Sequence, residues 1–376
     1  MPASAGSVVK PKFVVAGGGT AGHIEPGLSV CAALIERGVA KEQILWVGSR
    51  RGMEANSVPA AGIPVLLLSG RGIQRKLSAQ NLRSAAGLTK GFFTALLVLA
   101  RRRPAAILGL GGYASVAALV SGIVLRIPIL VAEQNARAGS ANRLAGRFAK
   151  VCAVPSDVTD LPSKVVTGNP VRPAIVAVSD HRDRSAARDR LGIAHSATVI
   201  AVFAGSLGSR RINEALAGAV ELCADRSDLF VYHVIGKRDF ASFLRPTVPA
   251  SGIRYRDVEY ESDMATLLEA ADLVISRSGG STVAELSAIG IASVLVPLPI
   301  APRDHQRFNA EMLSSVGAAV IVADADCTAQ RLAELMKELS ARPETLQTMG
   351  AAARSIGRPD AADRIADLLL TLAKHP

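Results

Sequence analysis

The stretch Ser276-Arg-Ser-Gly-Gly-Ser-Thr-Val-Ala-Glu285 joins two segments of different pattern. Residues 271–275 before it are apolar apart from one aspartate and predict a buried parallel strand, whereas residues 282–289 have the apolar spacing of a helix. The stretch therefore predicts a strand, a glycine turn and a helix start. The first N–H groups of such a helix have no partner within it and lie at the positive end of its dipole, which suits an anion such as a diphosphate.

Glu285 lies one turn into this predicted helix, where a carboxylate can accept hydrogen bonds from the hydroxyls of a ribose or another sugar. A solvent-exposed helix glutamate would have the same place in the sequence. The pair Gly279-Gly280 also occurs in ordinary connections between a strand and a helix, so by itself it is weak evidence of a phosphate site. The neighbouring segments decide between these interpretations.

The order of strand, glycine loop and helix recurs at residues 12–26 and again at residues 198–220. Strands and helices alternate through the rest of the first half of the chain. This alternation predicts an α/β protein of two Rossmann-like domains, each a doubly wound parallel sheet, that face one another across a cleft. Further strands are predicted at residues 43–47, 64–68, 105–109, 128–132 and 150–154.

The predicted domain boundary is the stiff segment Gly168-Asn-Pro-Val-Arg-Pro173, although an ordinary surface loop would have a similar composition. We expect a first domain over residues 1–171 and a second over residues 172–355, with a charged helix at 180–191 before the first strand and glycine loop of the second unit. The C-terminal segment 356–376 contains a last predicted helix, which we expect to pack back on the first domain.

Composition narrows the class of protein. Hydrophobic residues make up 49% of the 376 residues and aromatic residues only 4%, so the core consists of Ala, Val, Leu and Ile, as is typical of α/β proteins. The four cysteines are widely separated and lack metal-ligand spacing, which indicates buried thiols in a reducing cytoplasm and no metal site. No signal peptide is recognisable, and the apolar run 92–100 is too short to span a bilayer.

Charge is unevenly distributed. Residues 1–171 contain 20 Lys and Arg against 7 Asp and Glu, whereas residues 172–376 contain 23 against 25. The first domain therefore favours an anionic partner, either a membrane surface or nucleic acid. Nucleic-acid binding predicts aromatic residues among the basic ones, but Phe, Tyr and Trp total only 14 and do not interleave with them. We therefore expect that nucleic acid is not a partner of this protein.

The segment 71–103 carries eight basic residues and no acidic one. Basic side chains attract anionic lipid, and a few apolar side chains can enter the interface. We predict that this segment binds the membrane, and we expect residues 96–99 to belong to the core. A core helix with a solvated basic face is the alternative. The residues predicted to touch lipid are Ile73, Leu77, Phe92 and Phe93.

Neither the glycine loop at residues 17–22 nor the one at residues 205–208 matches a well-known nucleotide-binding motif. The required Gly-Lys-Ser/Thr of a Walker loop is absent. Gly17, Gly19 and Gly22 have the spacing of a dinucleotide-binding loop, but no acidic residue ends the strand predicted at 43–47. A nicotinamide enzyme is therefore the weaker interpretation, and we expect no cofactor.

Taken together, seven motifs in this order resemble the MurG family of peptidoglycan N-acetylglucosaminyltransferases, which make lipid II from lipid I. The resemblance covers nearly the whole chain. The motifs are Gly17-Gly-Gly-Thr-Ala-Gly-His23, Gly111-Gly-Tyr-Ala-Ser115, Glu133-Gln-Asn135, Gly168-Asn-Pro-Val-Arg172, Gly205-Ser-Leu-Gly208, Ser276-Arg-Ser-Gly279 with Thr282 and Glu285, and Asp304-His-Gln306 with Asn309-Ala310.

The resemblance implies a metal-independent, inverting transferase of the GT-B fold. Its donor would be UDP-N-acetylglucosamine, held mainly by the second domain, and its acceptor lipid I. It would act as a peripheral protein on the anionic cytoplasmic leaflet of the cell inner membrane. The implied substrate-binding residues are Thr20, Ala21, Gly22 and Asn135 in the first domain, Arg172 and Ser206 near the nucleotide and diphosphate, Glu261 at the uracil, Gly280, Ser281, Thr282, Val283, Ala284 and Glu285 around the diphosphate and ribose, and Gln306 at the sugar hydroxyls.

Three positions depart from the family pattern. Ala21 and Ala204 replace glycines, and Ala132 stands where many members have a histidine, so a role for that histidine does not carry over. The carboxylate of Glu261, at a position that is usually apolar, is acceptable if it points to water.

The base that takes the proton from the acceptor hydroxyl must then be found elsewhere. Imidazole titrates near neutrality and suits this task. His23, at the end of the first glycine loop, is the candidate, and a helix-capping role is its alternative. Glu133 is the second candidate base. His233 lies within an apolar strand, where we expect a structural role.

Two other functions remain open. Another GT-B transferase that uses a nucleotide sugar and a lipid acceptor such as diacylglycerol would need the same glycine loops. A non-catalytic nucleotide-binding protein would need them as well.

Overall fold

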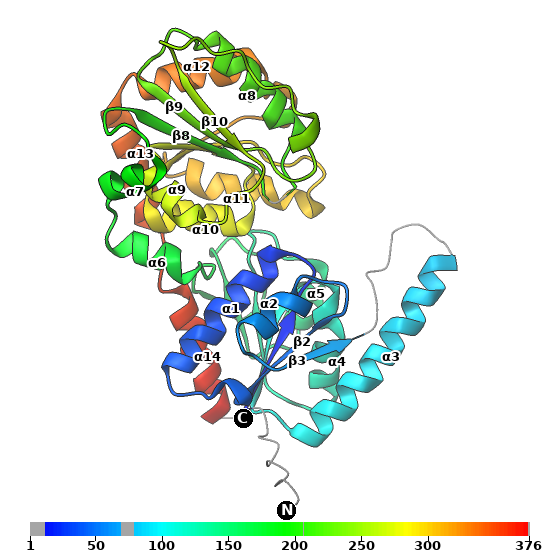
Figure 1. Cartoon of the computed structure of the whole chain (residues 1–376). Helices are drawn as coiled ribbons and strands as arrows, with labels where there is room; N and C mark the ends of the chain where they lie inside the picture. The colour runs from blue at the N-terminus through cyan, green and yellow to red at the C-terminus, as the bar shows by residue number, and fades with distance from the viewer. Residues whose placement is uncertain (1–11, 69–78, 206, 375–376) are drawn as a thin grey trace, which may run out of the picture. The chain divides into compact units, whose positions relative to one another are not determined.

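The structure is a computed structural model that describes residues 12–68, 79–205 and 207–374 (Figure 1). The chain forms two compact units. The first unit runs to Arg172 and includes the C-terminal segment from Asp360, and the second unit is Pro173–Pro359. Each contains one sheet of parallel strands, so the predicted α/β class is confirmed.

In the described part of the first unit, seven strands pair in the order β3-β2-β1-β4-β5-β6-β7. The five further strands predicted from sequence all form, within two residues of the expected bounds. The elements are β1 (Phe13–Gly17), α1 (Ala21–Glu36), β2 (Ile44–Ser49), α2 (Glu54–Ala60), β3 (Val65–Leu68), α3 (Ala79–Arg102), β4 (Ala106–Gly111), α4 (Tyr113–Val124), β5 (Ile129–Ala132), α5 (Ser140–Gly146), β6 (Val151–Val154), β7 (Lys164–Val166) and α14 (Ala361–Lys374).

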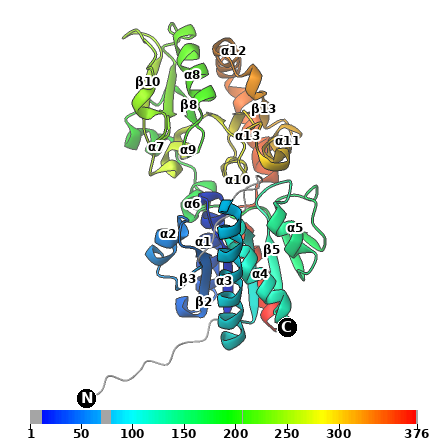
Figure 2. The ribbon, with the colours of Figure 1, turned by 90° about the vertical axis from the view of Figure 1, so that its right-hand side faces the viewer.

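Alternate residues of β1 enter two different cores, because successive side chains of a strand point to opposite faces of the sheet. Phe13 and Val15 pack in the core that contains residues of α1 and α14. Val14 and Ala16 pack in the core that contains residues of α3 and α4, which lie side by side in Figure 2. Both faces of the sheet are therefore covered, which explains why its central strands are almost wholly apolar.

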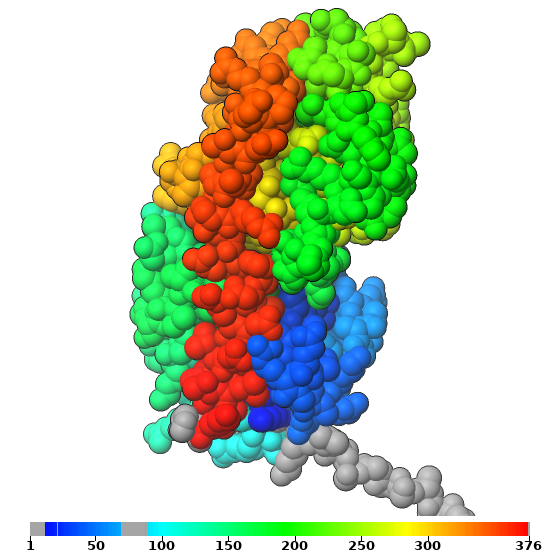
Figure 3. Space-filling view, turned by 90° about the vertical axis from the view of Figure 1, so that its left-hand side faces the viewer, coloured from blue at the N-terminus to red at the C-terminus, as the bar shows by residue number. Residues whose placement is uncertain are grey.

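Helix α14 lies along α1, as Figure 3 shows with α14 in red and α1 in blue. Their apolar faces share one core, and Arg37 at the end of α1 forms ion pairs with Asp363 and Asp367, both at 2.6 Å. The polar pairs are partly exposed and contribute little to stability. Burial of the apolar faces therefore holds the C-terminal helix on the first unit.

The described strands of the second unit pair in the order β10-β9-β8-β11-β12-β13. Its elements are α6 (Pro173–Asp180), α7 (Arg184–Leu191), β8 (Thr198–Phe203), α8 (Arg210–Leu222), β9 (Leu229–Val234), β10 (Arg254–Val258), α9 (Met264–Ala270), β11 (Leu273–Ser276), α10 (Gly280–Ile289), β12 (Ala292–Leu295), α11 (His305–Ser314), β13 (Ala319–Ile321), α12 (Ala329–Ser340) and α13 (Pro343–Ile356); short 3₁₀ turns lie at Lys41–Gln43, Phe240–Ser242, Pro302–Asp304 and Asp324–Asp326.

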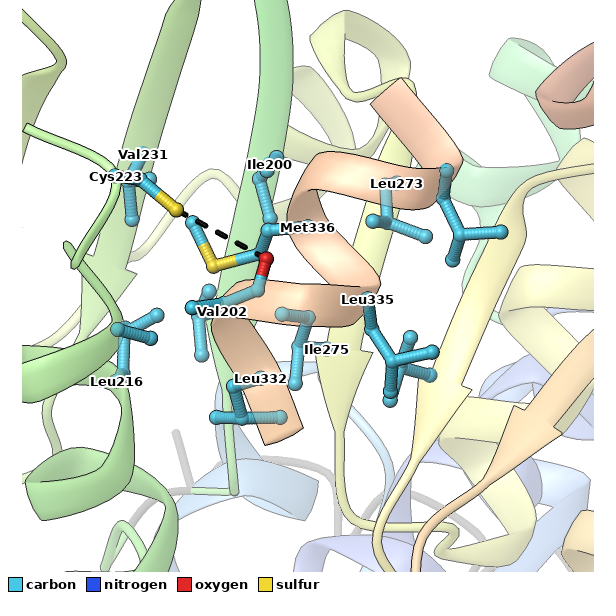
Figure 4. Close-up of a cluster of buried hydrophobic side chains, with 14 of the residues drawn as sticks. Ile200, Val202, Leu216, Cys223, Val231, Leu273, Ile275, Leu332, Leu335 and Met336 are labelled. Carbon is cyan, nitrogen blue, oxygen red and sulfur yellow. Dashed lines mark hydrogen bonds between the residues drawn. The ribbon is translucent and has the colours of Figure 1, made fainter. Parts of the chain in front are cut away.

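One face of this second sheet is closed by α8 and α12 (Figure 4). Leu216 of α8 and Met336 of α12 lie in the same core as Ile200 of β8, and all three are fully buried. The Cys223 thiol lies 3.9 Å from the Ala333 carbonyl oxygen, and burial raises its pKa. All four cysteines are buried and unbridged, as the sequence predicted.

The charged helix predicted at 180–191 forms, but its predicted first residue is wrong. Helix α6 ends at Asp180 and α7 begins at Arg184. The Asp183 side chain caps α7 by accepting a hydrogen bond from the Ala186 N–H at 3.0 Å. An aspartate at this position favours a helix start, because its side chain takes over one of the unpaired N–H groups of the first turn.

When the strands are numbered within each unit, both sheets have the order 3-2-1-4-5-6, and the first sheet continues with a seventh strand. In such a sheet the strand order reverses between the first and fourth strands, and ligands bind beyond the carboxyl ends of the strands at that point. This topology singles out the turns after β1 and β4 in the first unit, and those after β8 and β11 in the second.

Candidate active site

The turns after β1 and β4 pack backbone against backbone. Gly111, the last residue of β4, and Gly112 after it have φ angles of +93° and +74°, which residues with a Cβ rarely adopt. A Cβ at Gly112 would lie 2.8 Å from the carbonyl oxygen of Gly18 in the turn after β1. Only glycine allows this approach, so the two glycine motifs of the first unit form one surface.

Helix α1 begins directly after the first glycine loop, at Ala21, with Thr20 as its cap residue. The Thr20 hydroxyl lies 3.0 Å from Nδ1 of His23, whose side chain is partly exposed. Gly22 is exposed in the same first turn. Four of the predicted site residues are thus gathered at the N-terminus of one helix.

Glu133 is only 3% exposed, and its carboxylate forms hydrogen bonds within the turn that follows β5. It accepts hydrogen bonds from the backbone N–H groups of Gln134, Asn135 and Gly139 at 3.0–3.1 Å, and from the side-chain amides of Asn135 and Asn142 at 3.1 and 2.8 Å. Both oxygens are therefore occupied in shaping the turn that carries Asn135.

In the second unit, helix α10 begins at Gly280, and its N-terminal turn is joined to that of α11. The Ser278 hydroxyl donates to the backbone oxygen of Gln306 at 2.7 Å, and the Asn309 amide donates to the backbone oxygen of Ser278 at 3.0 Å. The side-chain oxygen of Gln306 accepts from the Leu298 N–H at 3.0 Å. Because this contact uses the side-chain oxygen, the amide nitrogen of Gln306 points away from Leu298 and can donate hydrogen bonds to another group.

The residues from Gly280 to Glu285, predicted around the diphosphate and ribose, all lie in the first two turns of α10. Gly280 to Thr282 form the first turn, where helical N–H groups have no intrahelical acceptor. Glu285 follows in the second turn with only 8% of its surface exposed, so it is no ordinary solvated glutamate. Arg172 is the last residue of the first unit before α6 and is partly exposed.

Arg277 joins three further turns at this end of the second sheet. Its guanidinium donates to the Ser209 hydroxyl at 2.8 Å and to the backbone oxygens of Val296 and Pro297 at 3.0 and 3.1 Å. It also forms an ion pair with Asp324 at 2.6 Å. The sequence alone predicted no role for Arg277, because none of these partners is near it in the chain.

Glu261 is partly exposed, and its carboxylate also has partners within the protein. Its carboxylate accepts hydrogen bonds from the Tyr232 hydroxyl and from the Asp263 N–H, both at 2.7 Å. Burial and the bond to Glu261 raise the pKa of Tyr232 to about 12, so the phenol remains a donor. The carboxylate is tolerated at this position because the protein itself supplies its partners.

The predicted membrane segment is described only in part. Two of its predicted lipid-contacting residues, Ile73 and Leu77, lie outside the described residues. The same holds for Ser206 of the second glycine loop. Phe93 is 55% exposed, whereas Phe92 is partly buried with its ring edge-on to that of Phe93.

Leu97 contradicts the expectation that residues 96–99 are core, because it is 56% exposed. It follows Phe93 by one helical turn, so the two form an apolar stripe on α3. Lys90 and Arg101 are exposed on either side of this stripe, one turn away along the helix. Among the described residues, no helix combines the length and the apolar character needed to cross a bilayer.

Two family models match this chain. The glycosyltransferase family 28 N-terminal domain matches residues 13–154, and the family 28 C-terminal domain matches residues 199–365.

Similar proteins extend over nearly the full length. UDP-N-acetylglucosamine--N-acetylmuramyl-(pentapeptide) pyrophosphoryl-undecaprenol N-acetylglucosamine transferases from Desulfitobacterium hafniense and Alkalilimnicola ehrlichii are 35% and 38% identical; the alignments cover 96% and 97% of this chain and 99% of each relative. The crystal structure of Acinetobacter baumannii MurG is similar with a TM-score of 0.77 and 30% identity, over 96% of this chain and 100% of that one. The chain belongs to glycosyltransferase family 28.

Proposed function

We propose that this protein transfers N-acetylglucosamine from UDP-N-acetylglucosamine to lipid I, undecaprenyl-diphospho-N-acetylmuramoyl-pentapeptide, and so forms lipid II for peptidoglycan synthesis. The observation that carries the proposal is that curated relatives named for this reaction align with nearly the whole chain. The geometry supports it, because each unit ends its central strands in glycine turns of the kind that bind phosphates.

The donor belongs to the second unit in this proposal. The N–H groups at the start of α10 bind its diphosphate, and the helix dipole stabilises the negative charge that grows there as UDP leaves. Glu285 accepts hydrogen bonds from the ribose hydroxyls, and the amide nitrogen of Gln306 donates to hydroxyls of the sugar. Arg277 holds the neighbouring turns in place through its hydrogen bonds to Val296 and Ser209.

The acceptor belongs to the first unit. Its hydroxyl oxygen attacks the anomeric carbon of N-acetylglucosamine while the bond from that carbon to the diphosphate breaks. UDP leaves with the electron pair, the configuration inverts, and the hydroxyl proton passes to a base.

We assign the base to His23. In the tautomer whose Nδ1–H donates to the Thr20 hydroxyl, Nε2 carries the lone pair that accepts a proton. The contact with Thr20 then fixes the ring orientation. Glu133 is the weaker candidate, because five donors already engage its two oxygens.

The protein acts at the cytoplasmic face of the cell inner membrane, where its lipid-linked acceptor lies. Phe93 and Leu97 enter the interface of the anionic leaflet, and the flanking Lys90 and Arg101 attract its headgroups. The net positive charge of the first half of the chain acts in the same direction.

A transfer assay with radiolabelled UDP-N-acetylglucosamine tests the proposal. We expect label to move to lipid I in detergent or liposomes, and no label to move to diacylglycerol. Transfer to diacylglycerol would assign a different lipid acceptor, and binding of the donor without transfer to either lipid would indicate a non-catalytic nucleotide-binding protein.

A further inference from the structure

A buried carboxylate lies beneath the first glycine loop. Glu54 is the first residue of α2 and is fully buried. One of its oxygens accepts a hydrogen bond from the Gly19 N–H at 3.0 Å, and the other accepts from the Ser49 N–H at 2.7 Å. A single side chain thus joins the loop after β1 to the turn after β2, although 35 residues separate Gly19 from Glu54.

Three glycines enclose this carboxylate. A Cβ at Gly18, Gly48 or Gly52 would lie within 2.5 Å of a Glu54 side-chain atom, which is closer than real Cβ contacts. Gly18 and Gly48 have no positive φ angle that would otherwise require glycine. Their lack of a side chain is therefore explained by the space that Glu54 occupies.

The contacts continue to the turn after β4. The Ser49 hydroxyl accepts hydrogen bonds from the Tyr113 hydroxyl at 2.5 Å and from the Arg51 N–H at 3.2 Å. Tyr113 is the first residue of α4 and follows Gly112, which lies against the carbonyl of Gly18. Turns after three strands of the first sheet are therefore connected through Glu54 and Ser49.

We propose that Glu54 is a positioning residue for the acceptor. It holds the Gly19 N–H and thereby sets the place of the residues that follow, Thr20 and His23, at the start of α1. This inference rests on the proposed function, in which these residues act on the acceptor hydroxyl. Both hydrogen-bond partners of its carboxylate belong to the first unit, which the proposed function assigns to the acceptor, so we expect its loss to affect the acceptor step and to leave donor binding unchanged.

Glu54→Gln is the sharpest probe, because a carboxamide has the same shape but only one acceptor oxygen. Its NH₂ group must face the N–H of either Gly19 or Ser49, so one buried donor loses its partner. Glu36→Gln, at the exposed end of α1, is the matched control.

The first measurement needs no activity. Hydrogen exchange of a peptide that covers residues 13–24 will be faster by about tenfold in Glu54→Gln, since a hydrogen bond that protects this loop is weakened. Unchanged exchange would show that Glu54 does not hold the loop.

The second measurement is steady-state kinetics with lipid I. We expect kcat/KM for the acceptor to fall by about tenfold to a hundredfold in Glu54→Gln, with the dissociation constant of UDP-N-acetylglucosamine, measured by calorimetry, changed by less than about twofold. Equal losses in donor and acceptor binding would indicate general destabilisation and overturn the inference.

Assays of the parent protein distinguish a failure of the proposed function from a failure of the role inferred for Glu54. If it does not transfer the sugar to lipid I, the proposed function is refuted and the acceptor role of Glu54 with it. If it is active and Glu54→Gln retains its acceptor kinetics, this inference alone is refuted.

Discussion

His233 makes the stability of the second unit depend on pH. Its imidazole is fully buried in β9, as expected of a structural histidine, with Nε2 3.0 Å from the Asn213 side-chain oxygen and Nδ1 2.8 Å from the Tyr255 hydroxyl. The Asn213 amide nitrogen donates to the Ile235 carbonyl, so its oxygen faces the ring and Nε2 must be the protonated nitrogen. Both nitrogens of the neutral ring are hydrogen-bonded, and a second proton on Nδ1 would place a positive charge in a fully buried site.

The magnitude follows from the number of protons involved. Burial lowers the pKa of His233 to about 3 from its ordinary value of 6.5. Between these values the unfolded chain binds a proton that the folded unit does not, so stability is complete above pH 6.5 and declines as the pH falls toward 3. One proton gives a slope of at most about 1.4 kcal/mol per pH unit, and the loss between pH 7 and pH 5 is therefore about 2 kcal/mol.

Urea unfolding at pH 7, 6 and 5 measures this loss. The chain has one tryptophan, Trp46, which lies in the first unit, so the unfolding transition seen by far-UV circular dichroism but not by tryptophan fluorescence belongs to the second unit. His233→Gln removes the titrating group and is expected to remove about 2 kcal/mol of the pH dependence. His195→Gln, an exposed histidine of the same unit, is the control. Equal pH dependence in the parent and in His233→Gln would refute the argument.

Three further predictions concern the proposed activity. Glu285→Ala is expected to raise the donor KM at least about tenfold with an unchanged circular dichroism spectrum, because the ribose loses a charge-assisted acceptor; an unchanged KM would remove Glu285 from the site. His23→Ala should lower kcat by about two to three orders of magnitude with donor affinity retained, and a kcat within a few-fold of the parent would transfer the search for the base to Glu133. Replacement of both Phe93 and Leu97 by serine should weaken salt-sensitive binding to anionic liposomes, whereas Leu244→Ser in the second unit should not; equal binding to neutral and anionic vesicles would contradict the role of the basic residues.

Much of the architecture is determined by local sequence. Apolar runs such as Phe13–Gly17 predict buried strands because a strand covered on both faces needs apolar side chains at every position. Glycines directly after these runs predict the turns, since φ angles such as the +94° of Gly19 exclude most other residues. The order of strands and helices then predicts parallel sheets with ligand-binding turns at one edge.

Other features depend on residues that only folding brings together. The sequence around Glu54 shows a glutamate near two glycines, and nothing local indicates that it binds the N–H of Gly19 in another loop. The exposure of Leu97 is equally hidden, because an apolar helix residue belongs to the core only if another element covers its face. Arg277 acquires its partners from turns after three other strands. Local patterns thus determined where the turns are, and tertiary packing decided which side chains hold them, because those side chains act between segments far apart in the chain.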